Sequence, residues 1–225
     1  MSRMNLLMPN NFYHIYSQSI ERGSVFIAEN NYKCFLEKFN EFISPISQTY
    51  AYCLLPNHFS FLIKLNSEED IFSWLKKNQK IADDTINLQD FKNLSNRLIE
   101  NFNPFSAHIS KQFSSFFIAY NKSLNKEESK IGREFYKIFG QELLSSEEQL
   151  RDTLLYIHAN PVRHGFINCM SDWKYSSFNS LISDKPTQLK RTEALALFDN
   201  IENFKFCHQE HNQKLVQKLE SKVLH

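Results

Sequence analysis

The chain has 225 residues, of which 42% are hydrophobic and 23% are charged. This length and composition predict an ordered globular protein of one domain, or at most two. The formal net charge is +1, with 26 Lys and Arg against 25 Asp and Glu. A nucleic-acid partner would therefore have to be bound by a local basic cluster, because the molecule as a whole has no strong positive field.

The cysteines and the N-terminal segment bear on the cellular compartment. The four cysteines lie far apart in the sequence and form no CxxC pair, which argues against a zinc knuckle and is typical of reduced thiols. The first residues lack the apolar core of a secretory signal, and no apolar run approaches the ~20 residues that span a bilayer. We therefore expect a cytoplasmic protein without a membrane segment.

The first third of the chain alternates between strand and helix patterns. Aromatic and β-branched residues with period-two alternation predict strands at 12–18, 49–55 and 58–65. Apolar residues at helical spacing predict helices at 30–43 and 67–79. Pro45 follows the first helix, and Pro56-Asn57 is a turn signal between the second and third strands.

The remainder of the chain is predicted to be mainly helical. Residues 80–104 are polar and weakly periodic, so we expect an insertion or a loop with short helices there. Further helices are predicted at 106–126, 145–161, 189–198 and 209–223, with a short strand at 134–139. Ser146 can cap the helix 145–161. Pro161 is expected to end that helix, because the residue before a proline is disfavoured in the α region.

The order of these elements predicts the fold class. A strand–helix–strand unit followed by an adjacent strand and a second helix is the split βαβ pattern of ferredoxin-like folds. We therefore predict an α+β fold with an antiparallel sheet and helices packed on one side of it. The predicted domain limits are 1–183 for the main domain and 184–225 for a helical C-terminal extension.

The strand 58–65 has two different faces. Because side chains alternate along a strand, one face is apolar and consists of Phe59, Phe61, Ile63 and Leu65. The other face begins with His58 and Ser60. A second histidine at position 60 would complete a pair able to hold a metal ion, so His58 is either half of a metal site or a histidine at the rim of a sheet.

Several stretches of the sequence resemble one family. YHIY near the start, AYCLLPNHFSFLIKL, and above all YIHANPVRHGF followed by WKYSSF are similar to the REP-associated tyrosine transposases, single-strand DNA transposases of the HUH superfamily. The resemblance extends from about Phe12 to about Phe206. It implies an HUH-type transposase fold and a metal-dependent nickase and strand transferase that acts on hairpin or single-stranded DNA, as a monomer or a homodimer.

The resemblance also implies roles for individual residues. Tyr156 would be the nucleophile that forms a 5′-phosphotyrosine, and His58 and Asn160 would hold Mg²⁺ or Mn²⁺. Residues four apart on a helix share a face, so Tyr156 and Asn160 can reach one point, with Asp152 one turn earlier. Ser60 stands where the family has its second histidine. A hydroxyl is a poorer ligand than imidazole, so Ser60 would be a weak metal ligand or a lost one.

Basic and aromatic side chains near the expected site are candidates for contacts with DNA. The candidates for phosphate contacts are Lys122, Lys126, Lys130, Arg133, Arg163 and His164. A solvated lysine-rich loop explains those between 122 and 133 equally well. Trp173, Tyr175 and Phe178 are predicted to be core aromatics rather than platforms for stacked bases.

The sequence leaves two functions of different kinds open. In the first, the protein cleaves and rejoins one DNA strand through Tyr156, with Tyr120 as the reserve nucleophile. In the second, it is a decayed or domesticated DNA-binding protein that keeps the fold and has lost the metal chemistry, for which Ser60 is the motivating observation. A globular domain with no role in nucleic-acid binding is the third alternative.

Overall fold

The computed structural model describes residues 6–17, 26–81, 85–93, 103–124 and 139–223. The strands in this part of the chain are β1 (Phe12–Ser17), β2 (Ser47–Leu55), β3 (His58–Leu65) and β4 (Phe139–Leu144). The α-helices are α1 (Glu29–Phe42), α2 (Glu68–Lys77), α3 (Leu88–Asn93), α5 (Pro104–Ser123), α7 (Glu147–Arg163), α8 (Phe178–Leu181), α9 (Arg191–Ala196) and α10 (Ile201–Val223). A short 3-10 helix lies at Met170–Asp172.

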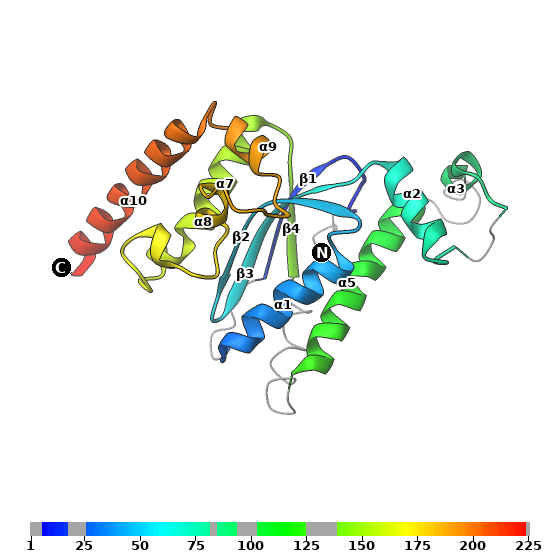
Figure 1. Ribbon diagram of the computed structural model, residues 1–225, viewed down its shortest axis with the longest axis horizontal. Helices are drawn as coiled ribbons and strands as arrows, with labels where there is room; N and C mark the ends of the chain where they lie inside the picture. Colours follow the sequence, from blue (N-terminus) through cyan, green and yellow to red (C-terminus); the bar gives the residue numbers. More distant parts are fainter. Residues whose placement is uncertain (1–5, 18–25, 82–84, 94–102, 125–138, 224–225) are drawn as a thin grey trace.

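The four strands form one sheet in the order β2-β3-β1-β4. Each neighbouring pair is antiparallel. Helix α1 connects β1 to β2, and α2, α3 and α5 lie between β3 and β4 in the chain (Figure 1). This order of strands and crossovers is the ferredoxin-like arrangement, so the predicted fold class is confirmed.

Helices cover both faces of the sheet, so the expectation of helices on one side is wrong (Figure 1). Phe59 and Phe61 of β3 pack in a core with α1 and α5. Leu62, on the other face, packs in a second core with α7 and the C-terminal helices. The sequence after β4 carries a further apolar stripe, and the second face of the sheet buries it. The alternation predicted for the strand 58–65 is confirmed by this division.

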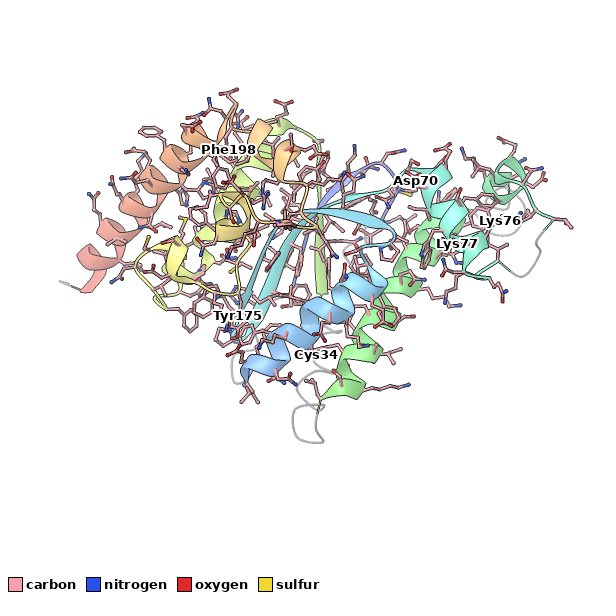
Figure 2. All side chains as sticks on the ribbon, viewed as in Figure 1. Cys34, Asp70, Lys76, Lys77, Tyr175 and Phe198 are labelled. Atoms are coloured by element: carbon pink, nitrogen blue, oxygen red, sulfur yellow. The ribbon has the colours of Figure 1, made fainter. Side chains whose placement is uncertain are left out.

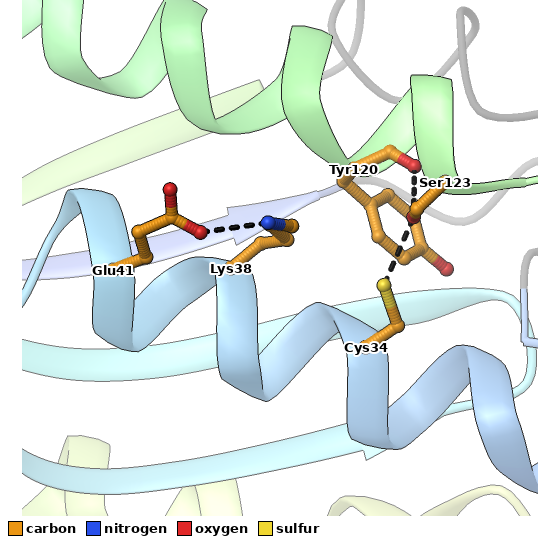
Figure 3. A network of polar contacts seen from close by, with 5 residues as sticks. All are labelled: Cys34, Lys38, Glu41, Tyr120 and Ser123. Carbon is orange, nitrogen blue, oxygen red and sulfur yellow. Dashed lines mark hydrogen bonds and ion pairs between the residues drawn. The ribbon is translucent and has the colours of Figure 1, made fainter.

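Helices α1 and α5 lie side by side on the first face. Cys34 donates a hydrogen bond from Sγ to Ser123 Oγ at 2.9 Å, and Ser123 Oγ donates to the carbonyl oxygen of Tyr120 at 2.6 Å (Figure 3). The side chain of Tyr120 is only 1% exposed. A DNA phosphate cannot reach a phenol buried in this core, so Tyr120 is unsuited as a reserve nucleophile.

The start of α7 agrees with the sequence, and its end does not. Ser146 Oγ accepts a hydrogen bond from the Gln149 amide at 3.2 Å, and Gln149 Oε1 accepts one from the Ser146 amide at 3.3 Å. This reciprocal pair is a capping box. The helix, however, continues past Pro161 to Arg163, which corrects the predicted end.

Gly165, rather than Pro161, determines where α7 ends. The Phe166 amide donates to the Pro161 carbonyl at 2.9 Å and the Gly165 amide donates to the Val162 carbonyl at 3.0 Å. With Gly165 at a φ of 72°, these bonds form a Schellman motif, which favours glycine at the left-handed position. Pro161 lies in the last turn of the helix, where its missing amide leaves one helical hydrogen bond unformed. Arg163 and the capping residue His164 are thereby placed one turn beyond Asn160.

Other boundaries differ from the prediction for local reasons. Helix α5 begins at Pro104 because Asn103 Oδ1 accepts a hydrogen bond from the Ser106 amide and proline suits the first helical position. The fourth strand was predicted at 134–139 and is found at Phe139–Leu144. Residues 134–138 lie outside the part of the chain that the structure describes.

The C-terminal segment packs against the main domain. Phe198 (Figure 2) belongs to the same core as α7 and β2, and so does Phe204. The domain limit at 183/184 stays a prediction. Within the described residues, no helix is long and apolar enough to cross a membrane.

The three aromatic residues predicted to be core residues are packed within the protein. The indole nitrogen of Trp173 donates to the Leu54 carbonyl at 2.8 Å. Tyr175 stacks on Tyr32 of α1, with ring centroids 3.9 Å apart (Figure 2). Phe178 is buried. Trp173 and Tyr175 are half-buried, so all three side chains contribute to packing, as predicted.

Candidate functional site

A cleft of about 470 Å³ lies between the sheet and α7. It is lined by residues of three strands and one helix, including His14, Tyr16, His58, Ser60, Glu142, Asp152, Tyr156 and Asn160. The structure therefore brings together the four residues for which the sequence predicts a catalytic or metal-binding role. Their roles stay predictions, and the geometry shows what chemistry each of them is able to perform.

His58 has one ring nitrogen committed and one available. Its Nδ1 lies 2.9 Å from Asn57 Oδ1, an acceptor, so Nδ1 carries the proton and Nε2 carries the lone pair. Burial, with a smaller effect of nearby His164, lowers the pKa of His58 to about 4. The imidazole is therefore neutral at neutral pH, as metal ligation requires.

Asn160 presents a buried oxygen that lacks a partner. The residue is 1% exposed, and its Oδ1 has no hydrogen-bond partner among the described residues. Leaving a buried acceptor unsatisfied costs about 1–3 kcal/mol, and native structures seldom tolerate this without a reason. A cation or a ligand donor in the cleft would satisfy this oxygen.

Tyr156 lies at the rim of the cleft, on the same helix face as Asn160. It is 36% exposed, in contrast to Tyr120. The Arg163 guanidinium lies over its ring at 4.6 Å, and the ring of His14 meets it edge-on at 5.8 Å. A phenol in this position is accessible to a phosphodiester and lies beside a permanent positive charge.

The Ser60 hydroxyl is engaged by a histidine. Its Oγ lies 2.6 Å from His14 Nε2, a short hydrogen bond between a diagonal pair of residues on β1 and β3, where Ser60 directly opposes Tyr16. Burial lowers the pKa of His14 to about 4, so this imidazole is neutral too. The hydrogen bond holds the hydroxyl within the protein, which makes Ser60 a poor candidate for the second metal ligand.

Sequence reasoning missed His14, Tyr16 and Glu142. In a ferredoxin-like order β1 pairs with β3 and β4. Alternate side chains of β1 therefore lie on the same face of the sheet as His58 and Ser60, next to them. Glu142 directly opposes His14, with Oε2 4.0 Å from Nδ1. Gly140 opposes Tyr16, and a Cβ at Gly140 would lie 2.6 Å from the Tyr16 ring, so the absent side chain lets this ring lie across β4.

The predicted DNA-contact residues fall into three groups. Arg163 and His164 are not lining residues of the cleft, but each contacts one: the Arg163 guanidinium lies over the Tyr156 ring, and the ring centroids of His164 and His58 are 4.9 Å apart. Lys122 is exposed at the end of α5, in the layer on the opposite face of the sheet from α7. Lys126, Lys130 and Arg133 lie outside the described residues.

The donors in the cleft fit a divalent cation. A neutral imidazole and an amide oxygen are suitable ligands, and the carboxylates of Glu142 and Asp152 line the same walls. Among the described residues, no group of three His, Cys, Asp or Glu side chains is arranged to hold a metal ion. A site here would therefore depend on the oxygen of Asn160.

The fold and the cleft define a ferredoxin-like protein with a tyrosine, a histidine and an amide gathered at one site. No family model matches the chain. The chain is 26% identical over 178 residues to a Haemophilus influenzae protein that has the provisional name REP-associated tyrosine transposase, and the match covers 73% of this chain and 85% of that protein. This comparison confirms the resemblance that the sequence motifs indicate. The solved structure of a REP-associated tyrosine transposase bound to a REP hairpin aligns with a TM-score of 0.47 at 15% identity, over 83% of this chain and 89% of that one.

Proposed function

We propose that the protein is a REP-associated tyrosine transposase that binds hairpin or single-stranded DNA in the cytoplasm and cleaves and rejoins one strand. The observation that carries this proposal is the convergence of Tyr156, His58 and Asn160 on one cleft. The resemblance to the Haemophilus influenzae protein supports the same function. The proposed function is consistent with the near-neutral charge of the chain, because recognition of DNA would rest on local charged groups.

Tyr156 has the position and the chemistry of a nucleophile. Attack of its phenolic oxygen on a phosphodiester forms a bond between phosphorus and the tyrosine oxygen and breaks the bond between phosphorus and the 3′ oxygen, which leaves as a 3′-hydroxyl. The resulting 5′-phosphotyrosine retains the energy needed to rejoin the strand. The phenolic proton must leave, and Asp152, one turn earlier on the same wall of the cleft, is the carboxylate placed to take part. Arg163, over the ring of Tyr156, can contact the phosphate group that Tyr156 attacks.

The remaining groups of the cleft hold and neutralise the phosphate. When bound at His58 and Asn160, a divalent ion would supply charge compensation as negative charge builds on the phosphate oxygens. Closure of the cleft by DNA would exclude water, and the phosphotyrosine would then be protected from hydrolysis.

Capture of a covalent DNA adduct tests this proposal. The full chain is incubated with Mn²⁺ and a labelled pool of DNA hairpins with randomised stems and flanks, and adducts that survive SDS are isolated and sequenced. We expect adducts with the wild type and none with Tyr156→Phe. Tyr120→Phe is the matched control, because the phenol that it removes is buried in the other core, and it should retain adduct formation.

Each other outcome points to a different function. An adduct that persists in Tyr156→Phe would place the nucleophile elsewhere. Hairpins that are bound but never cleaved would favour the second candidate, a DNA-binding protein without metal chemistry, for which the hydrogen-bonded Ser60 is the supporting observation. Failure to bind any hairpin at low salt would make the proposal wrong.

A further inference from the structure

We infer that His164, and not Ser60, supplies the second imidazole of the metal site. The site would consist of His58 from β3, Asn160 from the last turn of α7, and His164, the residue that caps this helix. This inference rests on one part of the proposed function, namely that the cleft binds a metal ion. It assigns to the end of a helix the ligand that the family resemblance leads one to expect on a strand.

The separation of the two imidazoles fits a shared ion. Metal–nitrogen bonds are about 2.1 Å long, so two imidazoles on one ion have ring centres on the order of 5 Å apart. The ring centroids of His58 and His164 are 4.9 Å apart, and the ring planes are inclined by 58°. The rings are therefore not stacked, and their edges can converge on a common point.

The third donor lies on the same helix face. Asn160 and His164 are four residues apart, and the His164 amide donates to the Asn160 carbonyl at 3.0 Å, so both side chains project from one turn. Asn160 Oδ1 is buried and has no partner within the described residues. An ion between His58 and His164 would provide the positive charge that this oxygen lacks.

The local backbone fixes His164 in this position. The Schellman motif at Gly165 extends α7 beyond Pro161 and makes His164 its capping residue. The C-terminal end of a helix carries partial negative charge, which favours a cation at this end of the cleft. Ser60, in contrast, has its hydroxyl engaged by His14 at 2.6 Å.

The donor set also indicates the class of metal. Two imidazole nitrogens and one amide oxygen suit Mn²⁺, Co²⁺ or Zn²⁺ better than Mg²⁺, which prefers an all-oxygen shell and keeps several waters. We therefore expect the wild type to bind Mn²⁺ and Co²⁺ in preference to Mg²⁺.

Metal titration of the full chain, without DNA, tests the assignment. Mn²⁺ binding is followed by calorimetry and Co²⁺ binding by its visible absorption, for the wild type, His58→Ala, His164→Ala and His164→Gln. Loss of a residue that only supports a ligand lowers affinity about 10–100-fold, so loss of His58 or His164 should lower it at least tenfold. Nitrogen couplings in pulsed EPR of the bound metal should show two imidazoles in the wild type and one in each histidine variant.

Two further variants separate a ligand from a merely structural residue. His108→Ala removes a half-buried histidine of α5, on the opposite face of the sheet, and should leave the affinity unchanged. Ser60→Ala should do the same. Circular dichroism at neutral pH establishes that each variant is folded before it is titrated.

The outcomes distinguish this inference from the proposed function. If His58→Ala loses the metal while both His164 variants bind as the wild type does, the inference is wrong and the proposed function stands. If Ser60→Ala loses affinity and His164→Ala does not, Ser60 is the ligand and the inference is again wrong. If the wild type binds neither Mn²⁺ nor Co²⁺, the inference fails. Binding of the same hairpin pool to the full chain at low salt in EDTA, measured without cleavage, then decides the DNA-binding function separately.

Discussion

Two histidines on either side of the interface between the sheet and α7 lie in different environments: His58 of β3 lines the cleft, and His158 of α7 is buried in the core. On the core side, His208 Nδ1 donates to the Phe204 carbonyl at 2.7 Å, so its Nε2 accepts from His158 Nδ1 at 2.9 Å. His158 Nε2 then accepts from Ser177 Oγ at 2.8 Å. Both nitrogens of both rings are satisfied within the protein.

His58 differs because it lines the cleft and, among the described residues, only its Nδ1 has a hydrogen-bond partner, Asn57 Oδ1. The comparison shows that burial alone does not separate a histidine that is fully hydrogen-bonded in the core from one that lines a cleft. His158 is 0% exposed and His58 is 8% exposed, and the pKa of each is lowered mainly by burial. The useful distinction is whether the second nitrogen has a protein partner.

The largest expected effect comes from removing a core histidine. His158→Ala removes the hydrogen bonds of His158 with His208 and Ser177 and opens a cavity between α7 and α10, so we expect it to lower the free energy of unfolding by roughly 3–5 kcal/mol. His58→Ala should lower the free energy of unfolding by only about 1 kcal/mol, because it removes a single hydrogen bond, to Asn57, and water in the cleft can replace it. Urea unfolding at neutral pH measures both values. Equal losses for the two variants would remove the distinction between the two environments.

Local patterns in the sequence predict the fold. None of them predicts the contact between the core histidines His158 and His208. The split βαβ order follows from the period-two and helical spacings of residues 12–79, and these identified the ferredoxin-like sheet. His208 is 50 positions away from His158. No local spacing predicts that two helices separated by that distance will place these rings together.

The sequence predicted those parts of the candidate site whose residues lie on the same helix or strand. The spacing of Tyr156 and Asn160 on α7 sufficed to place both at one cleft. His14 comes from a neighbouring strand, so finding it required the register of β1 against β3. The end of α7 was misjudged because Pro161 was weighed alone, although the stop depends on Gly165 and on hydrogen bonds that close around it.

A smaller effect is expected when the family histidine is restored at position 60. Ser60 Oγ already lies 2.6 Å from His14 Nε2, so the imidazole of Ser60→His would occupy space that the His14 ring fills. Overpacking of this kind typically costs about 1–3 kcal/mol. We expect the urea midpoint to fall in Ser60→His and to recover in the double variant His14→Ser with Ser60→His. A single variant as stable as the wild type would show that His14 has room to move.

The last expected effect concerns how stability depends on pH. Burial lowers the pKa of His208 to about 4 and that of His158 well below its usual value. In the unfolded chain both titrate near 6.5, so between about pH 6.5 and pH 4 the unfolded state binds more protons than the folded state. The free energy of unfolding must then fall as the pH falls, by up to about 1.4 kcal/mol per pH unit for each histidine.

His208→Gln isolates the contribution of the pair to this slope. Glutamine can still accept the hydrogen bond from His158 Nδ1, so the variant removes one titrating group while keeping the contact. Between pH 6.5 and pH 4.5, we expect the free energy of unfolding of this variant to change less steeply with pH than that of the wild type. The difference should correspond to the uptake of up to one proton on unfolding, or about 1.4 kcal/mol per pH unit. His58→Gln should lower the slope as well, because the pKa of His58 is also about 4.

Added Mn²⁺, if bound at the cleft, stabilises the folded state by mass action and should therefore raise the stability of the His208 variant but not that of the His58 variant.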